Sequence, residues 1–198
     1  MISLYTKNIE GTWFGVANSE KKVFATSFGV EEENVMRNLL KRIAFNEPFQ
    51  YSENASAFAE KVILCLKDVY DGKGLAQGLP LATEHLSEYA KKLIETVSLI
   101  PLGYVASYAA VAEVAGGSPR AVGRVMALNP FPLIVPCHRV VNSNFGLGGY
   151  GGGLKVKLAI LKRESRDYAF QSELSVGNAK LRLFPVEFVL RKVEKGKC

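Results

Sequence analysis

The chain has few of the residues that cross-link small proteins or bind metal ions. Its 198 residues include three cysteines and two histidines, and residues 1–64 contain neither type. It has no CxxC pair and no His-x3-His pair. A structural zinc site needs four Cys or His ligands at close spacings, and a disulfide framework needs a larger set of cysteines. We therefore expect neither a disulfide framework, nor a metal, nor a cofactor.

The sequence also lacks long hydrophobic runs. No apolar stretch reaches the roughly 20 residues that a membrane-spanning helix needs. The N-terminus, "MISLYTKNIEGTWF", lacks the basic, apolar and small-residue order of a signal peptide. With 48% hydrophobic and 22% charged residues, the composition is typical of a folded protein in water. We expect a cytosolic protein, or a nuclear one in a eukaryote, with no membrane partner.

Charge is distributed unevenly between the two halves. Residues 1–90 hold 9 Lys/Arg and 12 Asp/Glu, a net charge of −3, whereas residues 91–198 hold 16 and 7, a net charge of +9. Such an asymmetry suggests that the second half meets an anionic partner, either nucleic acid or a membrane surface. Ordinary solubility charge is the alternative explanation.

The first part of the chain predicts a small mixed domain. Residues 3–29 alternate apolar and polar positions between turn-forming stretches, which predicts a small antiparallel sheet. Residues 31–45 and 52–72 have apolar residues at helical spacing, and Cys65 falls among them as a core residue. Residues 71–85, rich in glycine, indicate a linker.

A further helix is expected over residues 83–100. Thr83 is placed to cap it. His85, near its start, has no visible partner and is predicted to lie at the surface. The apolar positions of this segment predict one buried stripe: Leu86, Tyr89, Leu93, Ile94 and Val97.

Residues 107–130 predict a helix-turn-helix. Ser107 can cap a short helix that Gly116 ends in a left-handed conformation. Ser118 and Pro119 begin a second helix, which the pair Asn129-Pro130 stops after about Leu128. A plain helical hairpin would give the same pattern.

The surface of the second helix favours nucleic acid over that simpler interpretation. Arg120 and Arg124 lie one turn apart and share a face. Ala121 and Gly123 keep much of the helix surface flat, so that a backbone could approach closely. Together with the basic second half, this arrangement predicts a DNA-binding helix.

The stretch "LIVPCHRVVN", residues 133–142, places Cys137 directly before His138 and after Pro136. Neighbouring side chains on a strand point to opposite faces, but in a turn entering a short helix the two could meet directly or through one water. A nearby base lowers the pKa of a thiol and makes it a nucleophile. From these residues alone, Cys137 is either a buried core residue or a nucleophile.

The surrounding residues resemble a known family. "IVPCHRVV" is similar to the active-site signature of the O6-alkylguanine-DNA alkyltransferases, and residues 103–165 follow the family's C-terminal domain. The elements SY, RAVG, NP-x-P, PCHRV, a Gly-Tyr-Gly loop and a late Glu occur in the family's order. The first hundred residues resemble the family only in length and pattern.

The resemblance implies a fold, a domain organisation and a reaction. The fold would be α/β plus mainly α: a ribonuclease H-like α/β domain at residues 1–78, a winged helix-turn-helix domain at residues 79–166, and an extension at residues 167–198. The reaction would be DNA repair by direct reversal, in which an alkyl group moves irreversibly from O6 of guanine, or O4 of thymine, to Cys137. The protein would act once, as a monomer, on double-stranded DNA bound through its minor groove after flipping the base.

The same resemblance assigns roles to individual residues. Cys137 would be the acceptor, His138 its base, Glu164 the acid that orients the histidine, and Tyr108 a proton donor to the leaving guanine. Asn129 would be a hinge between the recognition helix and the active-site turn, and Arg139 would bridge to the glycine loop or the N-terminal domain. DNA contacts would come from Ser107, Tyr108, Arg120, Ala121, Gly123 and Arg124. The base pocket would consist of Met126, Pro132, Val140, Tyr150 and Gly151.

Two other functions remain open from the sequence. A lesion-binding or regulatory DNA-binding module would use the same helices and perform no chemistry on Cys137. A thiol hydrolase would use the Cys-His pair for many turnovers, although such enzymes usually take their histidine from a distant position in the chain.

Overall fold

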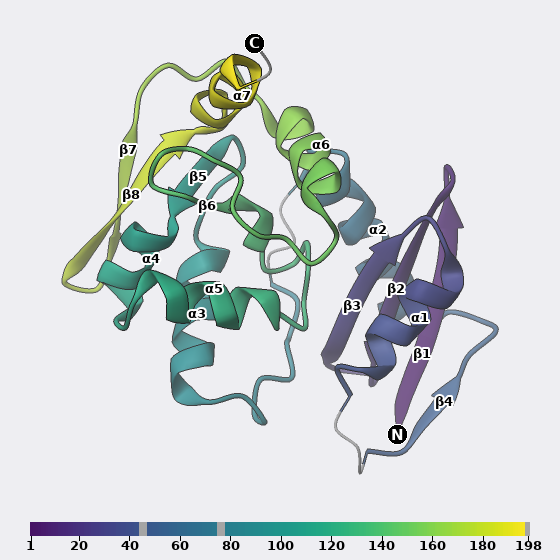
Figure 1. Ribbon diagram of the computed structural model, residues 1–198. Helices are drawn as coiled ribbons and strands as arrows, with labels where there is room; N and C mark the ends of the chain where they lie inside the picture. The colour runs from purple at the N-terminus through teal and green to yellow at the C-terminus, as the bar shows by residue number, and fades with distance from the viewer. Residues whose placement is uncertain (44–46, 75–77, 197–198) are drawn as a thin grey trace. The chain divides into compact units, whose positions relative to one another are not determined.

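The computed structural model describes residues 1–43, 47–74 and 78–196 (Figure 1). The chain divides into two compact units, both of mixed α/β structure. The first unit contains residues 1–69, 74–85 and 130–134, and the second contains residues 70–73, 86–129 and the chain from Val135 onward. Among the described residues, no helix has the length and apolar character needed to cross a membrane.

The first unit is built on a four-stranded sheet. Strands β1 (Ile2–Ile9), β2 (Thr12–Asn18) and β3 (Val23–Gly29) form an antiparallel meander. Strand β4 (Phe49–Tyr51) pairs in parallel with β1, which gives the order β3-β2-β1-β4. The antiparallel sheet expected over residues 3–29 is therefore confirmed.

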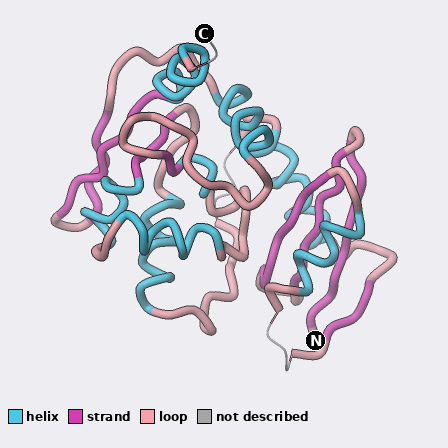
Figure 2. The backbone as a smooth tube through the Cα atoms, in the orientation of Figure 1, coloured by secondary structure: helices cyan, strands magenta, loops and turns pink. Residues whose placement is uncertain are grey.

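Helix α1 (Glu32–Leu40) packs closely on this sheet, as Figure 2 shows. Its buried side chains include Val35 and Leu39. A Cβ atom at Gly15 of β2 would lie 2.6 Å from a methyl group of Val35, so only glycine allows this approach. The helix begins with two glutamates and ends near Arg37, an order that complements the helix dipole.

Helix α2 (Ala57–Tyr70) follows β4 and holds Cys65. The side chain of Cys65 is only partly buried, so it contributes less to the core than expected. Burial and the charge of Asp68 raise the pKa of its thiol, which keeps it in the less reactive protonated form. The linker expected at residues 71–85 includes residues 75–77, which lie outside the described residues.

The second unit contains a four-stranded sheet of order β6-β5-β8-β7. Its centre is formed by β5 (Tyr104–Ser107), which pairs in parallel with β6 (Val140–Val141) and antiparallel with β8 (Ala179–Pro185). Strand β7 (Ser172–Val176) pairs with β8. Helices α6 (Leu154–Glu164) and α7 (Val186–Lys195) contact each other in this unit (Figure 1).

Helix α3 (Glu88–Ser98) begins later than expected. Its cap is Ser87, whose hydroxyl accepts from the Ala90 amide, and not Thr83. A serine at this position satisfies an amide that the helix leaves without a partner, as Thr83 was expected to do. The prediction that His85 lies at the surface is confirmed, because its side chain is exposed.

Helices α4 (Tyr108–Ala115) and α5 (Pro119–Ala127) follow the predicted pattern. The hydroxyl of Ser107 accepts from the Ala110 amide, and that of Ser118 accepts from the Ala121 amide, which confirms both caps. Gly116 has φ 88° and ψ 175°, so it ends α4 with positive φ but outside the left-handed helical region. The next glycine also has positive φ, and a Cβ there would lie 2.5 Å from the hydroxyl of Tyr89.

Candidate active site

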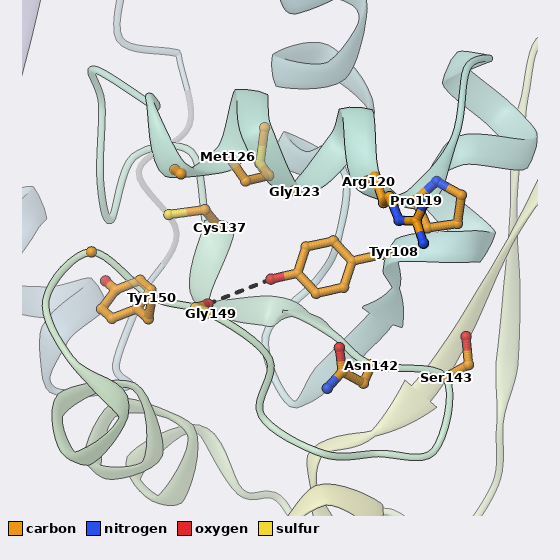
Figure 3. A pocket seen from close by; sticks show the side chains of 12 residues that line it. Tyr108, Pro119, Arg120, Gly123, Met126, Cys137, Asn142, Ser143, Gly149 and Tyr150 are labelled. Atoms are coloured by element: carbon orange, nitrogen blue, oxygen red, sulfur yellow. Dashed lines mark hydrogen bonds between the residues drawn. The ribbon is translucent and has the colours of Figure 1, made fainter.

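Cys137 lies in a short turn that opens onto a cavity. Residues Cys137–Arg139 form one turn of 3-10 helix after Pro136, closed by a hydrogen bond from the Arg139 amide to the Pro136 carbonyl. The cysteine is only 8% exposed, and it lines a cavity of about 600 Å³ in the second unit. Its sulfur therefore faces a space in which a base-sized ligand fits (Figure 3).

His138 is fully buried behind this turn and is held by Glu164 of α6. Nε2 of the histidine lies 2.9 Å from Oε1 of Glu164. Burial lowers the pKa of His138 below its usual 6.5 despite the neighbouring carboxylate, so the ring is neutral at pH 7. Glu164 accepts the Nε2–H, and Nδ1 has no hydrogen-bond partner among the residues that the structure describes. This tautomer leaves Nδ1 available to accept a proton.

Glu164 is ionised although no part of it reaches solvent. Burial alone would raise its pKa, but the hydrogen bonds and charges of His138 and Arg139 outweigh burial and lower the pKa to about 2. Arg139 donates from Nε to Oε2 at 2.9 Å and from Nη2 to Oε1 at 2.7 Å, a two-point contact. The carboxylate thus holds one fixed charge that orients both side chains.

Arg139 does not make the contacts expected from the sequence. Besides its contact with Glu164, its Nη1 donates to the carbonyl of Ile100 at 2.7 Å. Its hydrogen-bond partners, Glu164 and Ile100, therefore lie in the second unit and outside the glycine loop, which corrects the expected bridge to that loop or to the N-terminal domain. A buried guanidinium needs an ionised partner, and the nearest carboxylate is the one that holds His138.

Tyr108, the first residue of α4, points its ring into the cavity near Cys137 (Figure 3). Its hydroxyl donates to the carbonyl of Gly149 at 3.4 Å. Burial, with a smaller effect from Cys137, raises its pKa, so the hydroxyl stays protonated and able to donate. Gly148 has φ 68°, and a Cβ there would lie 2.8 Å from the Tyr108 ring, so this close approach requires glycine.

Helix α5 forms one wall of the cavity. Arg120, Gly123 and Met126, all predicted site residues, line it together with Pro119 and Ala127, which the sequence analysis did not single out. Ala121 and Arg124 lie on the same helix but do not line the cavity. The side chain of Arg124 is exposed.

The glycine loop, residues 142–153 between β6 and α6, forms the opposite wall. Tyr150 and Gly151 line the cavity as predicted, and Asn142, Ser143 and Gly149 join them without having been foreseen. Burial raises the pKa of Tyr150 well above its usual value, and its hydroxyl has no hydrogen-bond partner among the described residues. The unforeseen residues belong to the same loop, so its glycine content was the one available signal.

Two residues of the predicted base pocket lie elsewhere. Val140 is buried in β6 and its carbonyl accepts from Lys157 at 2.6 Å, so that atom already has a donor. Pro132 belongs to the first unit, where its carbonyl accepts from the hydroxyl of Thr26 at 2.8 Å. Neither residue lines the cavity in the described part of the chain.

Asn129 connects the end of α5 to the turn that holds Cys137. Its amide Nδ2 donates to the carbonyl of Val135 at 3.0 Å, and its own backbone amide donates to Met126 at 3.3 Å. The side chain is buried. If α5 or the Cys137 turn moved alone, this hydrogen bond would break, so the bond couples the two elements.

Lys157 is a buried cation that the sequence analysis counted only among basic residues. It is 0% exposed, and its ammonium group donates to the carbonyls of Val140 and Gly149 at 2.6 and 3.3 Å. Burial lowers its pKa to about 8, opposed by Cys137. Lys157 therefore connects the strand after the Cys137 turn to the glycine loop.

Comparisons with known proteins show likenesses to DNA alkyltransferases. Residues 88–166 match the family model described as the DNA binding domain of 6-O-methylguanine DNA methyltransferase. A methylated-DNA–protein-cysteine methyltransferase of Pyrobaculum aerophilum is 52% identical over 91 residues, which cover 46% of this chain and 60% of that protein. The chain thus spans about three fifths of the length of this curated relative.

Solved structures extend the likeness over more of the chain. The O6-methylguanine-DNA methyltransferase of Pyrococcus kodakaraensis matches with a TM-score of 0.65 and 29% identity, covering 83% of this chain and 99% of that one. Mycobacterium tuberculosis OGT in complex with DNA matches with a TM-score of 0.63 at 24% identity, over 82% and 92%, which shows the fold alone. The predicted resemblance to the alkyltransferases and the mixed α/β fold are confirmed.

Proposed function

We propose that this chain repairs DNA by moving an alkyl group from O6 of guanine, or O4 of thymine, to Cys137 in a single irreversible step. The observation that carries the proposal is the position of the Cys137 sulfur. It faces a cavity of about 600 Å³ walled by Tyr108, Tyr150 and α5, and a neutral, oriented imidazole follows it in the chain. A cavity of this kind suits a flat, uncharged ligand such as a purine.

The proposed step is a direct displacement at the alkyl carbon. Cys137 loses its thiol proton to Nδ1 of His138, through one water molecule, and Glu164 stabilises the resulting imidazolium. The thiolate then attacks the alkyl carbon, so that a sulfur–carbon bond forms as the carbon–O6 bond breaks. Tyr108 donates a proton to a ring nitrogen of the leaving guanine and regains one from water, to which His138 returns the proton that it took from Cys137. The thioether cannot be cleared by water, so each chain acts once.

Binding of DNA would position the base for this step. In the proposal, the second unit is a winged helix-turn-helix with α5 in the minor groove, and the first unit is a ribonuclease H-like domain. Arg120, at the mouth of the cavity and exposed, would fill the space left by the flipped base. Ala121, Gly123 and Arg124 would contact the DNA backbone, whereas Ser107, which is buried and caps α4, would act only by holding the start of that helix. The protein would act as a monomer on cellular DNA, in the cytoplasm or, in a eukaryote, the nucleus.

An intact-mass measurement tests the proposal. The protein is mixed with an excess of duplex that carries one O6-methylguanine, and a Cys137→Ser variant serves as control. We expect one methyl group per wild-type chain, located on Cys137 by peptide mapping, and none on the variant.

Other results would support other functions. An unmodified protein that still binds the lesion would indicate a lesion-binding module, and repeated turnover would indicate a hydrolase. A label on Cys65, or on Cys198, which lies outside the described residues, would also overturn the assignment.

A further inference from the structure

The C-terminal extension is folded into the unit that holds the candidate site. It begins after residue 166, where the family match ends. Its strand β8 pairs with β5, and β5 pairs on its other side with β6, the strand that leads into the glycine loop. The extension and the loop are therefore attached to opposite edges of one central strand (Figure 1).

Three aromatic rings join the extension to that loop directly. The ring of Phe145 lies 5.1 Å from that of Phe184 on β8 and 5.3 Å from that of Phe188 on α7, both edge to face. Such pairs are favourable beyond the area they bury. Leu147 of the loop packs, with Phe145 and Phe184, against a buried apolar cluster that contains Val186 and Val189 of α7. Much of the apolar surface that receives the loop thus comes from the extension.

The backbone of Phe145 is in a conformation that needs such support. Its φ is 63°, in the left-handed region that a bulky side chain rarely adopts. A tight turn accompanies it, with the Phe145 amide donating to Asn142 and the Asn142 amide donating to Gly146, both at 2.9 Å. Backbone strain of this kind persists where the surrounding contacts enforce it, and here the two rings that contact Phe145 both belong to the extension.

The residues on either side of Phe145 form a wall of the cavity. Asn142 and Ser143 precede it, and Gly149, Tyr150 and Gly151 follow it. At its far end the loop is fixed by donors from Tyr108 and Lys157 to the Gly149 carbonyl. The position of the wall is therefore set at one end by these polar contacts and near the other by the aromatic cluster.

We propose that the C-terminal extension, through Phe184 and Phe188, holds Phe145 and thereby fixes the glycine loop in the shape that receives the flipped base. The two phenylalanines are positioning residues, because they act through the loop and do not line the cavity. The inference rests on the proposed function for its effect on alkyl transfer, whereas its effect on the loop is independent of that function.

The central variant is Phe188→Ala, which removes one ring and leaves the site residues unchanged. Leu181→Ala is the matched control: it truncates a fully buried residue of the same extension that is outside the aromatic cluster. Phe188→Tyr keeps the ring and should behave like the wild type. If Phe188→Ala fails to fold, Phe145→Gly removes a ring from the other side of the contact and also relieves the backbone.

The first readout is amide hydrogen exchange, followed by mass spectrometry, in residues 140–153. We expect faster exchange there in Phe188→Ala or Phe145→Gly than in Leu181→Ala, and wild-type exchange in Phe188→Tyr. Equal exchange in this segment for Phe188→Ala and Leu181→Ala would overturn the inference, whether or not the protein transfers alkyl groups.

The second readout separates binding from transfer on a duplex with one O6-methylguanine. We expect the limiting transfer rate at saturating DNA to fall by about tenfold or more in Phe188→Ala, because a displaced wall misplaces the base. Affinity for an unmodified duplex should be unchanged, since α5 is intact. A limiting rate equal to that of Leu181→Ala would contradict the inference, whereas a wild-type protein that transfers nothing would contradict only the proposed function.

Discussion

The turn around Cys137 and helix α5 differ in where their charged side chains lie, buried at the turn and exposed on the helix. Around the turn, His138, Arg139, Lys157 and Glu164 are each at most 1% exposed, and their polar groups bond to one another or to carbonyls. On α5, the side chains of Arg120 and Arg124 are exposed to solvent. The buried charges fix the geometry of the site, whereas the exposed ones are free to meet a partner.

This difference predicts two kinds of failure. Removing one member of a buried charged network leaves another charge without compensation, so stability and chemistry should fall together. Removing an exposed arginine costs the fold little, so the loss should appear only when DNA is the substrate. The following predictions test the comparison, starting with the largest expected effect.

The largest effect should come from Glu164→Gln, which leaves Arg139 buried beside a neutral amide. We expect the free energy of unfolding to fall by about 3–5 kcal/mol, with transfer lost because His138 is no longer held in one tautomer. Urea denaturation and single-turnover kinetics would measure both. A variant as stable as the wild type would show that the network contributes no net stability.

The pH dependence of the free energy of unfolding gives a second test of the role of Glu164. The pKa of Glu164 is about 2 in the fold and 4.5 in its usual range, so its contribution is complete above pH 4.5 and is lost as pH falls toward 2. The lowered pKa of His138 acts in the same direction, beginning below pH 6.5. Wild-type stability should thus fall in acid, and the part due to Glu164 should be absent from Glu164→Gln.

Lys157→Met should produce the next largest effect, in alkaline solution. The pKa of Lys157 is lowered from 10.5 to about 8, so folding favours its neutral form. Its contribution to the free energy of unfolding is therefore largest above pH 10.5 and is lost as the pH falls through 8. Relative to the variant, the wild type should gain on the order of 3 kcal/mol between pH 7 and pH 11. Stability curves that stay parallel across this range would show that the ammonium is not strongly desolvated.

Methylation of Cys137, at the buried turn, should lower the stability of the fold by a smaller amount. A thiol can donate a hydrogen bond, whereas the thioether is only a weak acceptor. Losing such a bond costs about 1 kcal/mol, and each kcal/mol lowers the melting temperature of a chain of this size by roughly 2–4 °C. The hydrogen bond from Asn129 to Val135 connects the modified turn to α5, so affinity for DNA should fall as well. Equal melting temperatures and affinities before and after reaction would exclude this coupling.

The smallest effect on stability should come from Arg120→Ala, on the exposed side of the comparison. Transfer from duplex DNA should slow by about tenfold, because Arg120 supplies only part of the few kcal/mol that unstacking a base costs. Transfer from free O6-benzylguanine and the melting temperature should stay unchanged, and Arg37→Ala, an exposed arginine of the first unit, serves as control. Equal losses on both substrates would contradict a role in base flipping.

Helices α4 and α5 of the second unit could be predicted because their signals are local. The caps at Ser107 and Ser118 and the proline after the second cap each follow from one residue and its neighbours. Two predictions from the same reasoning were wrong or incomplete. Thr83 has the right chemistry for a cap, but Ser87 takes the position, and Cys65 lies at the edge of its helix's buried face.

The sequence by itself determined helices α4 and α5 with their caps, and the identity of the groups available for chemistry, because these depend on contacts within a few residues. Only the tertiary structure decided that Arg139 pairs with Glu164, that Lys157 is buried, and that Phe184 and Phe188 contact Phe145. Each of these contacts joins residues far apart in the chain. Which distant surfaces meet is set by packing of the whole unit, which no local pattern specifies.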